Sequence, residues 1–199
     1  MIGFIFRRVI LHFILGFFVF AYIRNQWFGK YKKKSSRNRE LLLCLFAAFL
    51  WTAIVQLWTP NYILGKSGLN IGEAHKDFLG TFKDRVGELW GINLIPFRTI
   101  RNYHNYVSGF VAWANLWGNI ILFIPYGFGL PLFWRKFRSF KKVLGTLFLS
   151  CFVIEFIQFF VGRSVDIDDV LLNMLGGCIG FFLWYYLYRK NPRILKFQR

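Results

Sequence analysis

Apolar residues occur along this chain in long runs that are separated by short polar segments. A helix needs about 20 mainly apolar residues to cross the ~30 Å hydrocarbon core of a bilayer. In the last apolar run, Gly176 and Gly180 form a Gly-xxx-Gly pair, which is typical of closely packed membrane helices. We expect each of four runs to form one membrane-spanning helix: Leu41 to Trp58, Val111 to Trp134, Val143 to Val161 and Val170 to Tyr188.

A fifth apolar run, Val9 to Ile23, is shorter and follows Arg7 and Arg8. Because arginine side chains can extend toward the membrane surface, the segment Ile2 to Ile23 is still able to span. The bulky, basic stretch that follows contains no small-residue cleavage site, which disfavours a signal peptide. We therefore expect five spans, or four if the first run lies in the interface.

The composition supports an all-α integral membrane helical bundle. Hydrophobic residues make up 56% of the chain, and charged residues make up 18%, below the roughly 25% of soluble domains. Lys and Arg total 26 against 9 Asp and Glu, which gives a net charge of +17. A soluble nucleic-acid binder would carry its basic residues among other polar ones, so we expect no nucleic-acid partner. All three cysteines lie inside apolar runs without a Cys-x-x-Cys pair, which indicates packing.

The basic residues indicate how the chain crosses the membrane. Most of them lie in three segments, residues 24–39, 135–142 and 189–199. The positive-inside rule places all three in the cytoplasm, with the N-terminus outside and the C-terminus inside. We expect residues 1–40 to form the first helix and a basic loop. A membrane domain over 41–188 and a basic cytoplasmic tail over 189–199 would follow.

A segment between the second and third spans has a different pattern. Over residues 70–90, apolar residues recur at helical spacing and the opposite face is charged. This pattern predicts an amphipathic extracytoplasmic helix on the outer membrane surface. A helix that folds over the bundle as a lid is an equally good interpretation.

Several polar side chains lie inside or beside the predicted spans, where ionisable groups are costly and usually functional. Glu155 and Gln158 share one helical face, and so do Asp169 and Asn173. The positive-inside orientation was derived without using these polar residues. It nevertheless places all of them in the outer half of the bilayer. The candidate ligand-binding residues are Asn119, Glu155, Gln158, Arg163, Asp166, Asp169 and Asn173, with Arg98 as a second guanidinium for phosphate or carboxylate.

Two interpretations of these residues stay open. They form a polar pocket that opens to the outside, or they bond the helices together, with Arg163 paired to Asp169 or Glu155. Asp166 and its two neighbouring aspartates offer oxygen ligands for Mg²⁺ or Ca²⁺. Their spacing does not match a calcium loop and Arg163 would repel a cation, so we expect no metal and no cofactor.

Four motifs in this order resemble the VanZ-like membrane protein family over about residues 41 to 188. They are Asn93-Leu-Ile-Pro-Phe97, Asn119-Ile-Ile-Leu-Phe-Ile-Pro-Tyr-Gly127, Glu155-x-x-Gln158, and Gly162-Arg163 through Asp169 to Asn173-x-x-Gly176. The resemblance implies a multi-pass protein of the bacterial cell membrane that is associated with reduced susceptibility to lipoglycopeptide antibiotics, teicoplanin above all.

We expect a binding protein rather than an enzyme, because a pocket in the outer leaflet beside an amphipathic helix could meet a lipid tail or a lipid head group. Its partner would be a membrane lipid, a lipid-linked cell-wall precursor or the lipid tail of the drug, bound at the outer-leaflet pocket. The alternative is a membrane enzyme that modifies a lipid-linked envelope molecule, with Glu155 and Asp169 as candidate acid–base residues. A transporter is less favoured because the sequence has no visible inverted repeat.

Overall fold

The computed structural model describes residues 2–33, 35–59, 92–106, 110–161 and 163–193. The amphipathic helix expected over 70–90 lies outside these residues. The elements in chain order are α1 (Ile2–Gln26), α2 (Gly29–Lys33), α3 (Arg37–Leu57), β1 (Ile92–Asn93), α6 (Arg98–Tyr106), α7 (Phe110–Phe133), η1 (Arg135–Phe137), α8 (Phe140–Phe160), β2 (Val165–Asp166) and α9 (Ile167–Lys190).

Five of the helices, α1, α3, α7, α8 and α9, are long and apolar enough to cross a membrane. This confirms the all-α membrane bundle, in its five-helix form. The observed helix α9 begins earlier than the predicted span because Asp166 caps it, accepting a hydrogen bond from the Asp168 N–H. Helix α3 likewise begins after Ser36, whose side chain accepts from the Arg39 N–H.

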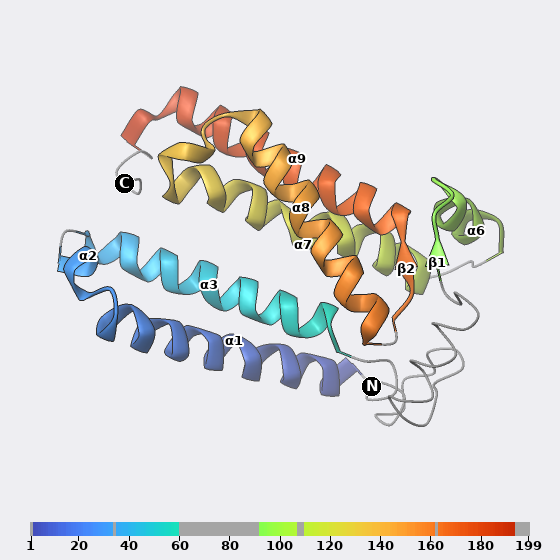
Figure 1. Cartoon of the computed structure of the whole chain (residues 1–199), viewed down its shortest axis with the longest axis horizontal. Helices are drawn as coiled ribbons and strands as arrows, with labels where there is room; N and C mark the ends of the chain where they lie inside the picture. Colours follow the sequence, from blue (N-terminus) through green and yellow to red (C-terminus); the bar gives the residue numbers. More distant parts are fainter. Residues whose placement is uncertain (1, 34, 60–91, 107–109, 162, 194–199) are drawn as a thin grey trace.

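The helices form two groups (Figure 1). Helix α1 runs antiparallel to α3, and this hairpin lies beside a group made of α7, α8 and α9. At the turn of the hairpin, Arg24 donates from Nε and Nη2 to the two carboxylate oxygens of Glu40, at 2.9 and 3.0 Å. Such a bidentate pair fixes the relative orientation of the two helices.

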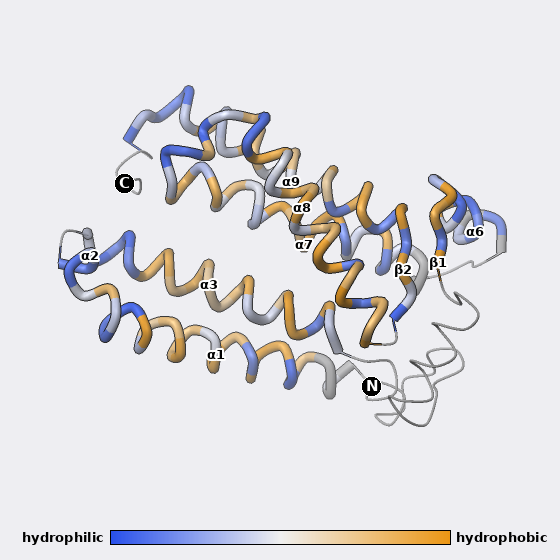
Figure 2. The backbone as a smooth tube through the Cα atoms, in the orientation of Figure 1, coloured by the Kyte–Doolittle hydropathy of each residue, from blue (hydrophilic) through white to orange (hydrophobic). Residues whose placement is uncertain are grey.

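The two ends of the bundle differ in chemistry (Figure 2). At one end, α2, η1 and the last turn of α9 carry hydrophilic residues, most of them Lys and Arg. We call this the basic end. At the other end α3 and α8 finish, α7 and α9 begin, and β1, β2 and α6 gather. We call this the polar end, because it carries the candidate site residues.

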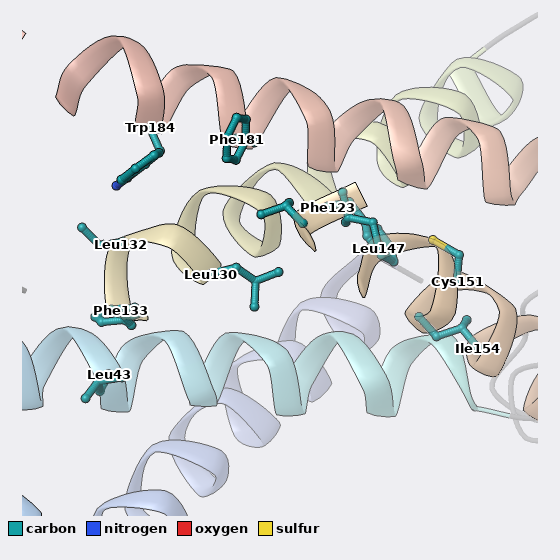
Figure 3. Packing of buried hydrophobic residues seen from close by; sticks show 11 residues of the cluster. Leu43, Phe123, Leu130, Leu132, Phe133, Leu147, Cys151, Ile154, Phe181 and Trp184 are labelled. Atoms are coloured by element: carbon teal, nitrogen blue, oxygen red, sulfur yellow. The ribbon is translucent and has the colours of Figure 1, made fainter. Parts of the chain in front are cut away.

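Large side chains from four helices fill the interior (Figure 3). Trp184 and Phe181 of α9 lie over Phe133 and its neighbours on α7, and Leu147 of α8 is completely buried among them. Most other large apolar side chains on the long helices are exposed in the isolated chain. An exposed apolar surface of this extent is typical of a protein whose solvent is lipid.

Helices α7 and α9 approach each other at backbone contact distance. A Cβ atom added at Gly176 would lie 2.0 Å from the carbonyl oxygen of Ile120, and one at Gly180 would lie 2.1 Å from that of Ile124. The close packing predicted from the Gly-xxx-Gly pair is therefore confirmed.

The close approach of α7 and α9 predicts how a substitution at Gly176 changes the stability of the protein. Gly176→Ala is expected to lower the free energy of unfolding by about 1–3 kcal/mol, because the new methyl group forces two backbones apart. Gly145→Ala is the matched control, since no other atom of the described chain lies within 4 Å of its added Cβ. It should be neutral or stabilising, because alanine favours helix more than glycine. Thermal unfolding in detergent measures both, and equal melting temperatures for the two variants would contradict the close approach.

Candidate functional site

A short parallel strand pair organises the polar end. Ile92 pairs with Val165, and Asn93 pairs with Asp166. The Asn93 side chain donates to Asp166 Oδ1 at 3.0 Å and to the Thr99 hydroxyl at 3.1 Å. The chain segment before α7 is thereby tied to the connection between α8 and α9.

Asp166 connects these two segments through several hydrogen bonds. Besides the bond from Asn93, its carboxylate accepts from the Thr99 hydroxyl and from the Asp168 N–H. Its own backbone N–H donates to Glu155 Oε2 at 3.0 Å. Asp166 therefore links α8, α9 and the start of α6.

Asp168 is completely buried, with 0% exposure, and its carboxylate binds three backbone N–H groups at the start of α6. It accepts from the N–H groups of Phe97, Thr99 and Ile100 at 2.5, 2.8 and 3.2 Å. Phe97 has a φ of 64°, which is unusual for a bulky residue. Both oxygens of Asp168 are engaged by backbone donors, so this aspartate acts here as a helix cap, a role different from that of the oxygen ligand considered from sequence.

A second part of the polar end joins Glu155, Arg163 and Asp169. Asp169 accepts from the Asn119 side chain at 2.5 Å, so α9 and α7 are bonded there. Burial lowers the pKa of Arg163 below its usual value, and the nearby charges of Asp169 and Glu155 oppose that shift. The guanidinium also donates to the Thr59 carbonyl at 3.4 Å. The charges of both acids therefore act on Arg163, and the ion pair that the sequence predicts between Arg163 and one of them stays a prediction.

The remaining candidates have more varied surroundings. Gln158 donates to the Leu57 carbonyl at 3.1 Å, while its own side-chain oxygen has no hydrogen-bond partner among the described residues. Asn173 is 2% exposed, and its side-chain oxygen likewise has no hydrogen-bond partner among the described residues. Arg98 is exposed at the first position of α6, immediately beside the backbone that Asp168 binds. Asn119 and Gln158 therefore bond helices together, as one of the two interpretations expected.

Sequence reasoning did not select Asn93 or Thr99 as site residues. The motif Asn93-Leu-Ile-Pro-Phe97 was the available signal, because it places a polar residue and a turn directly before α6. Nothing in its local spacing indicates that it pairs with Val165 and Asp166, about 70 residues later in the chain.

An apolar groove adjoins the site between α8, β1 and the start of α9. Its volume is about 430 Å³, within the range of roughly 300–1,000 Å³ typical of small-molecule sites. Glu155 and Asp166 are its charged lining residues. The other candidates do not line it. We call it the Glu155 groove; four phenylalanines of α8 contribute to its wall: Phe148, Phe152, Phe156 and Phe159.

This arrangement places an apolar groove beside two buried acidic residues, Glu155 and Asp166, which are 6% and 8% exposed. Glu155 uses Oε2 to hold Asp166. A molecule in the groove could place an aliphatic chain against the phenylalanines, beside the buried Glu155 side chain. The same carboxylate could also exchange a proton with a bound group.

Two comparisons with known proteins address the family. The family model described as VanZ/LLP1 matches residues 70–189, which include the described elements from β1 to β2 and all of α9 except its last residue. "Protein VanZ" of Enterococcus faecium is 32% identical over 109 residues, which is 54% of this chain and 60% of that protein. The chain thus matches less than two thirds of this relative's length. No solved structure matches the chain. Since the family model covers more than half of a chain with five candidate spans, this multi-pass membrane protein belongs to the VanZ/LLP1 family.

Proposed function

We propose that this protein reduces susceptibility to lipoglycopeptide antibiotics such as teicoplanin in a bacterial cell membrane. It does so by binding the lipid tail of the drug, or a lipid-linked cell-wall precursor, at its polar end. The observation that carries this proposal is the Glu155 groove, an apolar groove that has the buried residues Glu155 and Asp166 among its lining residues. The family membership supports the link to glycopeptides.

The polar part of the ligand must supply the selectivity. Burying a phenylalanine away from water is worth roughly 1.5–3 kcal/mol, but a lipid tail entering this groove leaves lipid, which is as apolar as the groove. For this reason the hydrophobic effect contributes little free energy to the association of helices or lipid chains within a membrane. Contacts at Glu155 and Asp166 therefore decide which amphiphile is held, and the phenylalanines decide how its chain lies.

The polar end must face the outside for this function, because lipoglycopeptides act on precursors outside the membrane. The basic end then faces the cytoplasm, as the positive-inside rule favours. Ser164 and Ser139 are exposed at opposite ends of α8.

Single cysteines test this orientation in a background with Cys44, Cys151 and Cys178 changed to alanine. Ser164→Cys should react with a membrane-impermeant thiol reagent on intact cells. Ser139→Cys should react only after permeabilisation, because it lies at the basic end. Labelling of Ser139→Cys on intact cells would show that the orientation is the opposite one. The groove would then lie on the cytoplasmic side, away from the drug.

The function is tested by expression in a susceptible bacterium. The minimal inhibitory concentration of teicoplanin should rise severalfold, while that of a glycopeptide without a lipid tail should not change. This difference is expected because the groove offers a site for an aliphatic chain. An equal rise for both drugs, or no rise for either, would contradict binding through the tail.

A second candidate function is modification of a lipid-linked envelope molecule. The electrostatic interaction of Arg163 with both Glu155 and Asp169 favours it, since two acids and a cation can divide general acid, general base and anion-binding roles. Mass spectrometry of envelope lipids after deletion distinguishes the two. An altered lipid that is restored by wild type but not by Glu155→Gln identifies an enzyme, whereas unchanged lipids identify a binder.

A further inference from the structure

The turn between β1 and α6 exposes a run of apolar side chains. Leu94, Ile95 and Phe97 are 71%, 54% and 62% exposed, and Pro96 between them is exposed as well. We call these four residues the apolar turn. They lie outside the five candidate spans, so lipid along the flanks of the helices does not account for their exposure. Exposed apolar side chains gathered in one place indicate a contact surface.

Hydrogen bonds hold the apolar turn in a fixed shape. The N–H of Ile95 donates to Asn93 Oδ1 at 3.2 Å, and the N–H of Phe97 donates to the buried Asp168 carboxylate. Pro96 has no N–H. Phe97 keeps a φ of 64°, which a bulky residue adopts only where its surroundings enforce it. Backbone donors that enter lipid must already be bonded within the protein, and these donors meet that condition.

Two arginines follow the apolar turn on α6. Arg98 and Arg101 are three residues apart, so they share one face of the helix, and both are exposed. Neither side chain has a hydrogen-bond or ion-pair partner in the part of the chain that the structure describes. Every acidic side chain described at the polar end is buried or half-buried. The two guanidinium groups therefore complement an anion that comes from outside the chain.

The apolar turn lies at the level where the spans leave the membrane. Asn93, directly before it, pairs with Asp166 of β2, which lies between the end of α8 and the start of α9 (Figure 1). At this same end of the bundle, Trp113 and Trp117 are exposed near the start of α7. Tryptophans are enriched at the interface between hydrocarbon and lipid head groups.

These features together select one kind of partner. A soluble anion would satisfy the arginines but would leave the apolar turn in water, and hydrocarbon alone would leave the arginines without an anion. A phospholipid surface offers both, because its apolar chains lie beneath a layer of phosphates. Arginine suits phosphate because its planar guanidinium donates two parallel hydrogen bonds.

We propose that the apolar turn inserts into the leaflet at the polar end and that Arg98 and Arg101 bind the phosphate of an anionic phospholipid in that leaflet. Leu94 also lines the Glu155 groove. Insertion therefore holds this end of the groove at the level of the lipid head groups. The membrane contact does not depend on the function proposed for the groove, and it is tested without drug.

A nitroxide spin label at Ile95→Cys tests the insertion. The full chain, with Cys44, Cys151 and Cys178 changed to alanine, is reconstituted in vesicles of phosphatidylcholine and phosphatidylglycerol. Oxygen collects in hydrocarbon and a neutral nickel chelate stays in water, so the ratio of their collision rates with the label reports its depth. This ratio should be severalfold higher at Ile95→Cys than at Ser164→Cys, an exposed position before β2 that serves as the aqueous reference. Equal ratios would overturn the insertion. Weak collision of the Ile95→Cys label with both reagents would overturn it too, because protein would then cover the turn.

The arginines are tested by changing the lipid charge and the side chains together. Adding phosphatidylglycerol to phosphatidylcholine vesicles should raise the oxygen-to-nickel ratio at Ile95→Cys severalfold, because basic residues are attracted to an anionic surface. Arg98→Gln combined with Arg101→Gln should lose this response and still fold, since both side chains are exposed. Lys141→Gln combined with Lys142→Gln removes two exposed charges at the basic end and should keep the response. A ratio that ignores phosphatidylglycerol, or an undiminished response in the arginine variant, would refute phosphate binding by α6.

Phe97→Asn separates the aromatic ring from the shape of the backbone. Asparagine tolerates a left-handed φ better than phenylalanine, so this variant keeps the turn and removes its largest apolar side chain. The oxygen-to-nickel ratio at Ile95→Cys should fall toward the value at Ser164→Cys. An unchanged ratio would refute the insertion of the Phe97 side chain.

Discussion

Asp168→Ala is expected to lower the free energy of unfolding by about 3–5 kcal/mol, because it leaves the N–H groups of Phe97, Thr99 and Ile100 without their acceptor. The Asp168 carboxylate also holds Phe97 in its left-handed conformation. Loss of this cap should therefore release the start of α6 and the β1–β2 pair together. The expected result is a large fall in the melting temperature of the purified protein.

Asp168→Asn and Ser164→Ala are the controls. Asparagine keeps one acceptor oxygen and should have an intermediate effect. Ser164 is exposed in the loop before β2, and its truncation should be nearly neutral. If Asp168→Ala melts at the wild-type temperature, the carboxylate does not hold α6.

Glu155→Gln and Asp169→Asn are expected to abolish protection against teicoplanin without lowering stability. Each amide keeps an oxygen for the bond seen in the structure, from the Asp166 N–H to Glu155 and from the Asn119 side chain to Asp169. What each variant removes is the charge and the exchangeable proton. Side-chain bonds between membrane helices average only ~0.6 kcal/mol, so a purely structural cluster should tolerate both changes.

Arg163→Ala should also abolish protection, but it needs a stricter control. Its removal takes away a positive charge that interacts with Glu155 and Asp169, and it deletes a bond to the Thr59 carbonyl. Melting temperature and membrane level must therefore be measured beside the drug response. If the melting temperature, the membrane level and the protection against the drug all fall together, Arg163 has a structural role.

The spans could be predicted from sequence because the membrane constraint is local. A run of about 20 apolar residues is readable without knowing its neighbours, and the five long helices coincide with the five runs. Helix starts were less accurate, as at α9, because a cap such as Asp166 depends on backbone geometry. The close helix packing at Gly176 and Gly180 could also be predicted, because the four-residue spacing of the two glycines is a local feature of the sequence.

The site was only partly readable from sequence. Helix faces and the positive-inside orientation predict that the polar residues share one depth and that Arg163 lies near Asp169 or Glu155. They do not predict the bond between Asn119 and Asp169. The role of Asp168 did not follow, because it depends on a strand pairing between distant segments. The Glu155 groove arises from tertiary packing, which periodicity does not encode.

The most direct test of a functional carboxylate at the polar end is the change in teicoplanin inhibitory concentration that Glu155→Gln causes at wild-type membrane level. A return to the level of cells without the protein, with an unchanged melting temperature, is the predicted result. Full protection by Glu155→Gln would contradict a functional charge at this position and would leave the polar cluster as a structural bond between helices.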